Sequence, residues 1–316
     1  MDNDEAEDED DGDDSWHSAD EDFGGETSAY HSDSPALPLV PFTNQVGGHA
    51  SFLRFSNKAI CKPVSENEQV FYEYLEAHHP EVLPFIPAYL GVLNYILLED
   101  LTDGLKAPCI LDIKMGTRQY GIWANEKKMR GQMRKCQKTT SYETGIRICG
   151  MQAYNVITRR FLFQNKYYGR KLTKETLPLT LREFFYNGRE VDLSHIPILQ
   201  RKLKDLAKII KSLNGYRFYA SSLLIYYDGD SGPSKSPLQG VATVIDFAHC
   251  TAGIYNQGNM PPYPPMHPDE PDKGYLLGLK NLMMIFRDIW DQNGGDGTVS
   301  QEWLKEEDEL WKDVWE

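Results

Sequence analysis

The alternation of apolar and polar residues along this chain predicts both strands and helices. Short apolar runs bounded by turn residues predict strands at 59–63, 218–227 and 241–247, and two more within 89–99. Apolar residues spaced three or four apart predict helices at 66–75, 199–213 and 275–290, and a basic one at 126–137. Thr298 and Gln301 have the capping-box spacing and predict the start of a last helix. The strand at 241–247 is nearly all apolar, so we expect both of its faces to be buried.

Two charges interrupt the apolar run PCILDIKMG at residues 108–116. Side chains two residues apart in an extended strand share a face, so Asp112 and Lys114 point into the same space. Leu111 and Ile113 then face the core. Burying two charges side by side costs free energy unless they hold each other or a ligand. The run therefore predicts either an internal ion pair or part of a binding site.

Charge is distributed very unevenly along the chain. Residues 1–34 hold 15 Asp and Glu and no Lys or Arg, which leaves 33 basic against 32 acidic residues elsewhere. The stretch from Lys114 to Lys174 contains 15 Lys and Arg but only two acidic residues, a net charge of +13. Such a cluster repels itself unless it faces an anion. We expect residues 1–36 to form a disordered acidic tail, and the basic stretch to bind a highly anionic partner.

Composition also indicates a compartment. The chain has no run of 18 apolar residues and begins with an acidic stretch, which argues against a membrane span and a signal peptide. Its five cysteines form no CxxC pair, a pattern typical of reduced thiols. We expect an intracellular protein of the cytoplasm, the nucleus or both, with no membrane partner.

Two further motifs extend the chemistry suggested by Asp112 and Lys114. A Ser-Ser pair ending at Ser222 follows an aromatic strand start, and Asp246 closes the apolar strand at 241–247. An aspartate at the end of a strand is most often a cap or a turn residue. With the other motifs beside it, the same carboxylate suits Mg²⁺ that bridges nucleotide phosphates, and the Ser222 hydroxyl can complete the metal shell.

Several common nucleotide- and metal-binding motifs are missing. The sequence contains no GxGxxG, Walker GxxxxGK or HRD motif, which argues against an ordinary protein kinase and a P-loop enzyme. Residues 291–302 have the length of a calcium loop, but Asp296 stands where that loop needs glycine. The basic stretch alone would also suit a solvated helix face or a nucleic-acid patch. Few aromatic residues interleave with it and the acidic tail would compete, so we expect no nucleic-acid partner.

The motifs together resemble one known family. PCILDIKMG is similar to the PxxxDxKxG signature of the inositol polyphosphate kinases, and SSLL at 221–224 and IDF at 245–247 resemble its companion motifs. The segments QMRKC, GMQAYN, NKYYGR and DKGYLLGLKNL resemble the inositol hexakisphosphate kinase branch of that family. The likeness spans about residues 38 to 290.

The resemblance implies an α+β fold with two lobes, distantly like protein kinases, and with ATP between the lobes. An N-terminal lobe at 37–101 would cover ATP, and a C-terminal lobe at 102–316 would carry a basic inositol-phosphate-binding segment at about 120–145. The implied activity transfers the γ-phosphate of ATP, with Mg²⁺, onto inositol hexakisphosphate to form a diphosphoinositol pentakisphosphate. Two alternatives stay open: a multikinase acting on lower inositol phosphates, and a non-catalytic polyanion-binding module with the same fold.

Positions that match the family motifs imply roles on the nucleotide side. Lys62 would contact the nucleotide phosphates, and Glu68 or Glu73 would orient it. Glu99 and Leu101 would form the hinge and offer main-chain groups to adenine.

The resemblance implies further roles around the transferred phosphate. Asp112 would hold the ribose hydroxyls, and Lys114 would lie between the transferring phosphate and the inositol phosphate. Asp246 and Ser222 would hold Mg²⁺. The substrate would meet Lys114 together with Lys127, Lys128, Arg130, Arg134, Lys135, Lys138, Lys166 and His249.

The charge of the basic segment agrees with such a substrate on physical grounds. Six phosphates carry about −9 to −12 charges at roughly −1.5 to −2 each, against the net +13 of the segment. On a helix, Lys127, Arg130 and Arg134 share one face. No general base is evident for a hydroxyl acceptor, whereas a phosphate acceptor is already anionic and needs none.

Overall fold

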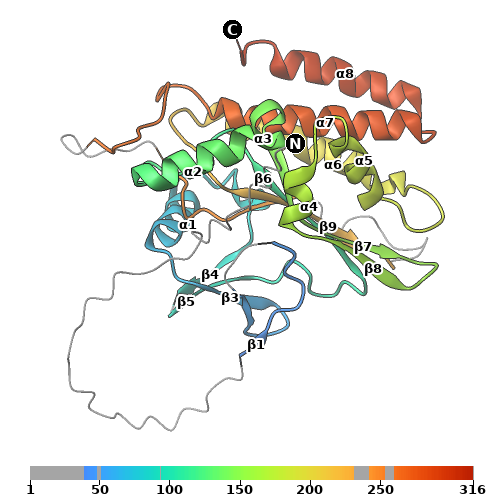
Figure 1. Ribbon diagram of the computed structural model, residues 1–316, viewed down its shortest axis with the longest axis horizontal. Coiled ribbons are helices and arrows are strands. Elements are labelled where there is room, and N and C mark those ends of the chain that lie inside the picture. The colour runs from blue at the N-terminus through green and yellow to red at the C-terminus, as the bar shows by residue number, and fades with distance from the viewer. Residues whose placement is uncertain (1–38, 48–50, 93, 231–241, 253–259, 316) are drawn as a thin grey trace, which may run out of the picture. The chain divides into compact units, whose positions relative to one another are not determined.

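The computed structural model describes residues 39–315 apart from 48–50, 93, 231–241 and 253–259. The expected acidic tail at 1–36 lies outside the described residues. In the described part of the chain, strands form two five-stranded antiparallel sheets, and the chain passes from the first to the second through residues 100–107 (Figure 1).

The first sheet has the strand order β1-β2-β3-β5-β4. Its strands are β1 (Val40–Pro41), β2 (Leu53–Arg54), β3 (Ala59–Pro63), β4 (Tyr89–Val92) and β5 (Tyr95–Glu99). Helix α1 (Glu66–His78) follows β3, and a short 3₁₀ helix (Leu83–Phe85) precedes β4. The predicted strand at 59–63 and the two predicted strands within 89–99 are confirmed.

The second sheet has the order β10-β9-β6-β7-β8 and places the charged run in its centre. Its strands are β6 (Pro108–Met115), β7 (Ile146–Asn155), β8 (Arg160–Gln164), β9 (Ser222–Asp228) and β10 (Thr243–Ile245). β10 is an edge strand in which Ile245 is only half-buried. The expected burial of this strand on both faces therefore holds only for its first two residues.

The two faces of the second sheet differ in chemistry. Alternate residues such as Leu111, Ile113 and Leu223 belong to the hydrophobic core, which includes apolar side chains of three helices. These are α5 (Leu177–Phe184), α6 (Ile196–Ser212) and α7 (Lys273–Gln292). Figure 1 shows α6 and α7 on one side of this sheet and β3 to β5 on the other. Asp112 and Lys114 alternate in sequence with these core residues of β6 and occupy the opposite face of the sheet, as predicted.

Helix α1 connects the first sheet to the second. The ring of Phe71 lies 5.9 Å from that of Phe218 and 5.2 Å from that of Phe247, centroid to centroid. Tyr72 on the next position packs edge-on against Phe247 at 4.9 Å. These aromatic contacts fix α1 beside the end of β10, so Glu68 on α1 can reach the backbone just after Asp246.

The remaining elements complete the second lobe. They are α2 (Glu126–Gln137), α3 (Thr140–Thr144), α4 (Lys166–Lys171), a 3₁₀ helix (Leu193–His195) and α8 (Gly297–Trp311). The prediction of a basic helix at 126–137 is confirmed at both ends. None of the helices in the described residues is long and apolar enough to cross a membrane.

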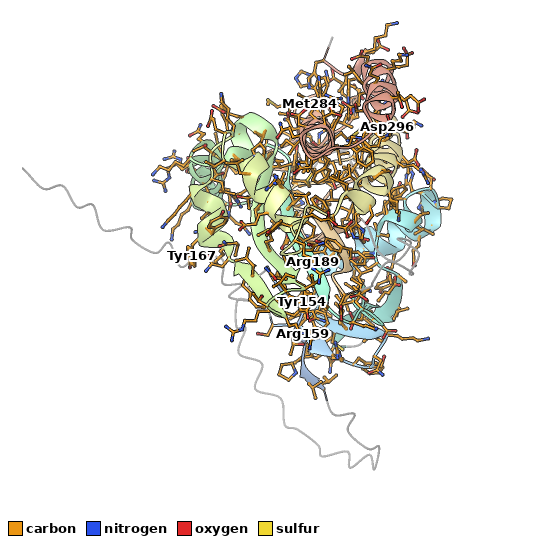
Figure 2. All side chains as sticks on the ribbon, turned by 90° about the vertical axis from the view of Figure 1, so that its right-hand side faces the viewer. Tyr154, Arg159, Tyr167, Arg189, Met284 and Asp296 are labelled. Carbon is orange, nitrogen blue, oxygen red and sulfur yellow. The ribbon has the colours of Figure 1, made fainter. Side chains whose placement is uncertain are left out.

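The start of α8 corrects the predicted cap. Asp296, labelled in Figure 2, accepts hydrogen bonds at Oδ1 from the Thr298 backbone N–H at 2.8 Å and from the Thr298 hydroxyl at 2.7 Å. Thr298 is therefore a donor inside the first turn and not the cap. An aspartate caps as well as a threonine does, so the capping-box spacing alone misplaced the helix start by two residues.

Candidate active site

Lys62 on β3 contacts carboxylates from two other elements. Its Nζ lies 2.8 Å from Glu68 Oε1 on α1 and 2.6 Å from Oδ1 of Asp246, which follows β10. Glu68 is fully buried, and its Oε1 also accepts a hydrogen bond from the Phe247 backbone N–H at 3.1 Å. The Glu68 carboxylate thus fixes both the lysine and the backbone just after Asp246.

Glu73, the other candidate partner of Lys62, points elsewhere. Its Oε1 accepts hydrogen bonds from Gln69 at 3.0 Å and from the Tyr89 hydroxyl at 3.2 Å on the exposed side of α1. The geometry therefore favours Glu68 as the residue that orients Lys62.

Lys114 lies against two residues with unusual backbones. Its Nζ donates a hydrogen bond to the Ala220 carbonyl at 2.7 Å and lies 3.7 Å from Asp246 Oδ2. Ala220 has φ 56° and Asp246 has φ 66°, a left-handed conformation that costs free energy in residues with a side chain. Strained backbone of this kind is concentrated at functional sites, and here both strained residues contact one ammonium group.

Mutual charge keeps this cluster ionised. Burial alone would raise the pKa of Asp246, but Lys62 and Lys114 more than offset it and hold that pKa well below its usual range. Burial would lower the pKa values of Lys62 and Lys114, but the neighbouring acidic groups, led by the Asp246 carboxylate, together more than reverse this effect for both. Lys62, Asp246 and Lys114 therefore form a charged network at neutral pH.

Asp112 lies on the same face and has a different environment. It is 5% exposed, and burial raises the pKa of its carboxyl group although Lys114 opposes that rise. A Cβ atom on Gly47 would lie 1.9 Å from Asp112 Oδ2, so only glycine fits there. A Cβ on Gly150 of β7 would likewise lie 2.0 Å from the Val46 carbonyl oxygen. The segment at 46–47 therefore lies directly on this face of the sheet.

A chain of hydrogen bonds joins that segment to the junction between the sheets. Asn44 Nδ2 donates to Thr102 Oγ1 at 2.9 Å, and the Thr102 hydroxyl donates to the buried Asp100 carboxylate at 2.7 Å. Glu99 ends β5, and its side chain accepts a hydrogen bond from the Ala88 N–H at 3.2 Å. Leu101 is half-buried in the turn that follows. The two expected hinge residues thus lie where the chain passes between the sheets.

Ser222 is brought beside Lys114 by strand pairing. It is the residue of β9 that pairs with Lys114 of β6, and it is fully buried. Ser222 Oγ and Asp112 Oδ1 have no hydrogen-bond partner among the described residues. Buried oxygens rarely lack a partner in native structures, so these two atoms suit a ligand or a hard cation. The described residues contain no cluster of three or more His, Cys, Asp and Glu side chains suited to a metal.

Helix α2 meets the cluster through His249. Asn125 caps the helix by accepting the Lys128 backbone N–H at 2.8 Å. The Lys128 Nζ then lies 3.4 Å from His249 Nε2, three residues after Asp246 in the chain. A Cβ on Gly121 would contact His249 at 3.4 Å, so the chain leading into α2 packs closely there.

The basic residues of α2 divide between two faces. Lys128 and Lys135 are half-buried on the face that includes the buried Cys136. The exposed positions are Lys127, Arg130, Arg134 and the C-cap residue Lys138. The helix face predicted for Lys127, Arg130 and Arg134 therefore exists but is turned to solvent. On it, Arg130 pairs with Glu126 at 2.5 Å.

Lys166 begins α4, on the far side of β7 from β6. Asn165 caps this short helix by accepting the backbone N–H groups of Tyr167 and Tyr168. Lys166 Nζ lies 5.4 Å from the centre of the Tyr167 ring, which Figure 2 shows at the edge of the molecule. α4 packs closely on β7, because a Cβ on Gly169 would lie 1.9 Å from the Ile148 carbonyl oxygen.

Sequence reasoning missed Arg147. It pairs with Lys114 across β6 and β7 and is 6% exposed. The run IRIC at 146–149 held the same signal as the run around Asp112, namely a charge inside an apolar strand.

Known proteins were compared with the chain by sequence. The family model for inositol polyphosphate kinases matches residues 95–287. An uncharacterized inositol polyphosphate kinase of Schizosaccharomyces pombe is 43% identical over 217 residues, which cover 64% of this chain and 22% of that protein. Mouse inositol hexakisphosphate kinase 3 is 41% identical over 208 residues, 62% of this chain and 51% of the relative. The chain thus spans about half the length of the mouse protein and less of the yeast one.

Solved structures support the fold. Inositol phosphate multikinase Ipk2 from S. cerevisiae, in complex with ADP and Mn²⁺, matches with a TM-score of 0.60 and 26% sequence identity. The match covers 73% of this chain and 98% of that one. The predicted α+β, two-lobed architecture is therefore confirmed.

Proposed function

This chain belongs to the inositol polyphosphate kinase family, and from that premise we propose that it is an ATP- and Mg²⁺-dependent inositol hexakisphosphate kinase. It transfers the γ-phosphate of ATP onto a phosphate of inositol hexakisphosphate and forms a diphosphoinositol pentakisphosphate. The observation that carries the proposal is the charged network of Lys62, Asp246 and Lys114, with Lys62 fixed by the buried Glu68. The curated relatives named as inositol hexakisphosphate kinases support the choice of acceptor.

On the nucleotide side, each proposed contact uses a group that the fold holds in place. Lys62, oriented by Glu68, binds the phosphates of ATP. Asp112 accepts hydrogen bonds from the ribose hydroxyls, for which its unpartnered Oδ1 is suited. Glu99 and Leu101 offer main-chain groups to adenine at the junction of the sheets. We also propose that this junction, at 101–102, divides the two lobes.

The donor set fits a magnesium ion. Asp246 supplies a carboxylate and Ser222 a buried, unpartnered hydroxyl, and Mg²⁺ prefers oxygen ligands and shares its shell with nucleotide phosphates. When bound, Mg²⁺ neutralises negative charge on the phosphates.

Lys114 stabilises the group in transfer. Its ammonium is held by the Ala220 carbonyl at 2.7 Å, which fixes the charge without neutralising it. A positive charge already in place needs no reorganisation as negative charge develops, and such electrostatic stabilisation is a large part of phosphoryl-transfer catalysis. Lys114 lies next to Asp246 and so contacts both the transferred phosphate and the acceptor.

The acceptor binds against the basic side chains beyond Lys114. Lys128, Lys135 and His249 form the inner part of this surface, and Lys166 lies beyond β7. Lys127, Arg130, Arg134 and Lys138 face solvent and add a long-range attraction for a polyanion. A phosphate acceptor is already anionic, so the chain needs no side chain to remove a proton from it.

Product analysis tests this function directly. The protein is incubated with ATP, Mg²⁺ and inositol hexakisphosphate, and the products are resolved by anion-exchange chromatography. We expect a product more strongly retained than the hexakisphosphate, and no such product from Asp246→Asn. The Asp246→Asn protein should still bind inositol hexakisphosphate, because the acceptor contacts lie elsewhere. An active Asp246→Asn enzyme would contradict the assignment of that residue.

The similarity to Ipk2 supports one rival, a multikinase acting on hydroxyls of lower inositol phosphates. The same chromatography with inositol trisphosphate and tetrakisphosphate separates the two. Turnover of these acceptors at a higher kcat/KM than the hexakisphosphate would favour the multikinase. Binding without any turnover would favour the non-catalytic polyanion-binding module.

We also propose that the protein acts inside the cell, in the cytoplasm or nucleus. Its five cysteines are all free, as expected for a reducing compartment. Fractionation of cells with an antibody to the chain would test this, and recovery in the secreted fraction would contradict it.

A further inference from the structure

Arg147 lies directly beside Lys114. The two residues are paired across the antiparallel strands β6 and β7. Paired residues of neighbouring strands point to the same face, with Cβ atoms about 4.5–5.5 Å apart. Arg147 therefore shares the charged face of the second sheet with Asp112 and Lys114.

A β-bulge puts the arginine on this face. The pairing shifts by one residue between Asp112 and Ile113, which leaves Cys149 as the extra residue of β7. If the register of Asp112 and Gly150 continued without this shift, Ile148 would lie opposite Lys114, and Arg147 would point into the core. Bulges are over-represented next to active sites, where they redirect a side chain. The local backbone thus departs from regular pairing just where it presents a second cation.

The structure leaves one guanidinium nitrogen of this arginine without a partner among the described residues. Arg147 is 6% exposed, and its Nη1 has no hydrogen-bond partner among the described residues. Among those residues, no carboxylate forms an ion pair with it either. Two other arginines differ: the buried Arg217 donates to main-chain oxygens through Nη1 and Nη2, and the half-buried Arg287 pairs with Glu307. A buried, charged donor without a partner costs free energy, which a ligand would recover.

The position of Arg147 assigns it to the acceptor and not to the nucleotide. In the second sheet, β7 lies on one side of β6, whereas β9 and β10 lie on the other. Lys114 therefore lies between Asp246, which follows β10, and Arg147. Burial raises the pKa of the Cys136 thiol on α2, and the charge of Arg147 opposes this rise, so the field of the arginine reaches the inner face of that helix. The arginine thus lies on the opposite side of Lys114 from Asp246, the proposed metal ligand.

We propose that Arg147 binds a phosphate group of the acceptor, next to the one that Lys114 contacts; this role rests on the proposed function. A guanidinium presents parallel N–H groups that match two oxygens of one phosphate, whereas a lysine offers only a point charge. Arg147 and Lys114 together form a two-point contact at the floor of the acceptor site. The contact selects acceptors with phosphates on neighbouring ring positions.

Binding without nucleotide tests the proposal. Calorimetry measures the Kd of inositol hexakisphosphate for the full chain, for Arg147→Met and Arg147→Lys, and for Arg160→Met as a matched control on the exposed edge strand β8. We expect Arg147→Met to raise Kd at least tenfold, Arg147→Lys to raise it less, and Arg160→Met to leave it within twofold. In turnover assays, Arg147→Met should raise the acceptor KM and leave the KM for ATP within twofold.

Thermal unfolding separates binding from a structural role. Removing an unpaired buried cation should leave Tm of the ligand-free protein unchanged or higher, whereas a structural arginine would lower it. An unchanged Kd for Arg147→Met, an equal rise in the KM for ATP, or a lower Tm that accompanies weaker binding would each overturn the proposal.

Failure of the proposed kinase function can be distinguished from failure of the role proposed for Arg147. If the wild-type chain binds inositol hexakisphosphate without transferring phosphate, the kinase proposal fails, and the Kd values still decide the role of Arg147. If turnover occurs and Arg147→Met binds normally, only the role of Arg147 fails. A wild-type chain that does not bind the hexakisphosphate at all would overturn both.

Discussion

The second sheet has two faces built from the same strands, and one face is apolar whereas the other carries buried charges. Along β6, Leu111 and Ile113 are fully buried against the helical core, whereas Asp112 and Lys114 alternate with them in sequence and face the other way. One face supplies apolar burial, and the other holds buried charges that each cost free energy unless partnered. The comparison predicts that substitutions on the apolar face lower stability, whereas substitutions on the charged face lower activity.

The largest effect is expected at the centre of the charged face. Lys114→Met should lower kcat/KM by about a thousandfold, which is about 4 kcal/mol of transition-state stabilisation, because the fixed positive charge is lost. Steady-state kinetics with the hexakisphosphate would measure it. Lys208→Met, on the exposed part of α6, is the control and should retain full activity. A loss below tenfold for Lys114→Met would contradict its placement at the reacting phosphate.

The neighbouring core position should show the reverse behaviour. Ile113→Ala should lower the free energy of unfolding by about 2–5 kcal/mol, because it removes buried methyl groups and leaves a cavity. Denaturant unfolding measures the loss, with the exposed Ile157→Ala as control. Per folded molecule, Ile113→Ala should keep kcat within a few-fold of wild type. If it removed activity without loss of stability, the two faces would not be independent.

The orientation of Lys62 should matter next. Glu68→Gln should lower kcat/KM for ATP by about 10- to 100-fold, because hydrogen bonds to charged groups contribute about 1.5–3 kcal/mol. Glu73→Gln, on the same helix, should change it less than twofold. Equal effects of the two substitutions would contradict the assignment of Glu68, and not Glu73, as the residue that orients Lys62.

A smaller contrast is expected across helix α2. Lys128→Ala should raise the acceptor KM by about five- to tenfold, because this lysine lies on the inner face beside His249. Arg130→Ala should raise it by less than twofold, since exposed ion pairs contribute about 0–1 kcal/mol. Initial rates over a range of acceptor concentrations would compare them. A larger effect for Arg130→Ala would place the acceptor on the outer face.

The smallest effect concerns stability and pH. Burial raises the pKa of Asp112 above its ordinary value of 3.8, so its ionised form is disfavoured in the folded state. This destabilisation is absent below pH 3.8, develops as pH rises from 3.8 to the folded pKa and persists at higher pH. Asp112→Asn should therefore raise Tm at pH 7 and not at pH 3.5.

Asp246 should show the opposite sign. Lys62 and Lys114 lower its pKa, so its ionised form stabilises the fold at neutral pH, and this contribution is lost as pH falls below about 3.8 toward the folded value. Asp246→Asn should lower Tm at pH 7. If Asp112→Asn and Asp246→Asn changed Tm at pH 7 in the same direction, the environments assigned to the two carboxylates would be wrong.

The sequence predicted the elements whose patterns are local. The helix at 126–137 and the strand at 59–63 have the predicted bounds, because periodicity and caps define them within a few residues. Asp112, Lys114, Ser222 and Asp246 meet as expected, since strand pairing brings their motifs together.

Other features depend on tertiary contacts and could not be predicted. The choice of Glu68 over Glu73 follows from how α1 packs against Phe247. The orientation of Arg147 follows from a bulge that has no sequence signature of its own. The solvent-facing side of α2 depends on which residues pack beneath the helix, and charge alone gave no indication of it.

The hydrogen bond from Lys114 to the Ala220 carbonyl has a consequence for experiments that replace every residue in turn. A carbonyl belongs to the main chain, so no exchange of side chains deletes it, and Ala220→Gly would even suit its left-handed conformation better. A mutational scan will record position 220 as tolerant of glycine. Replacing the amide that contributes this oxygen by an ester, through chemical synthesis of the protein, would weaken the acceptor and reveal its contribution.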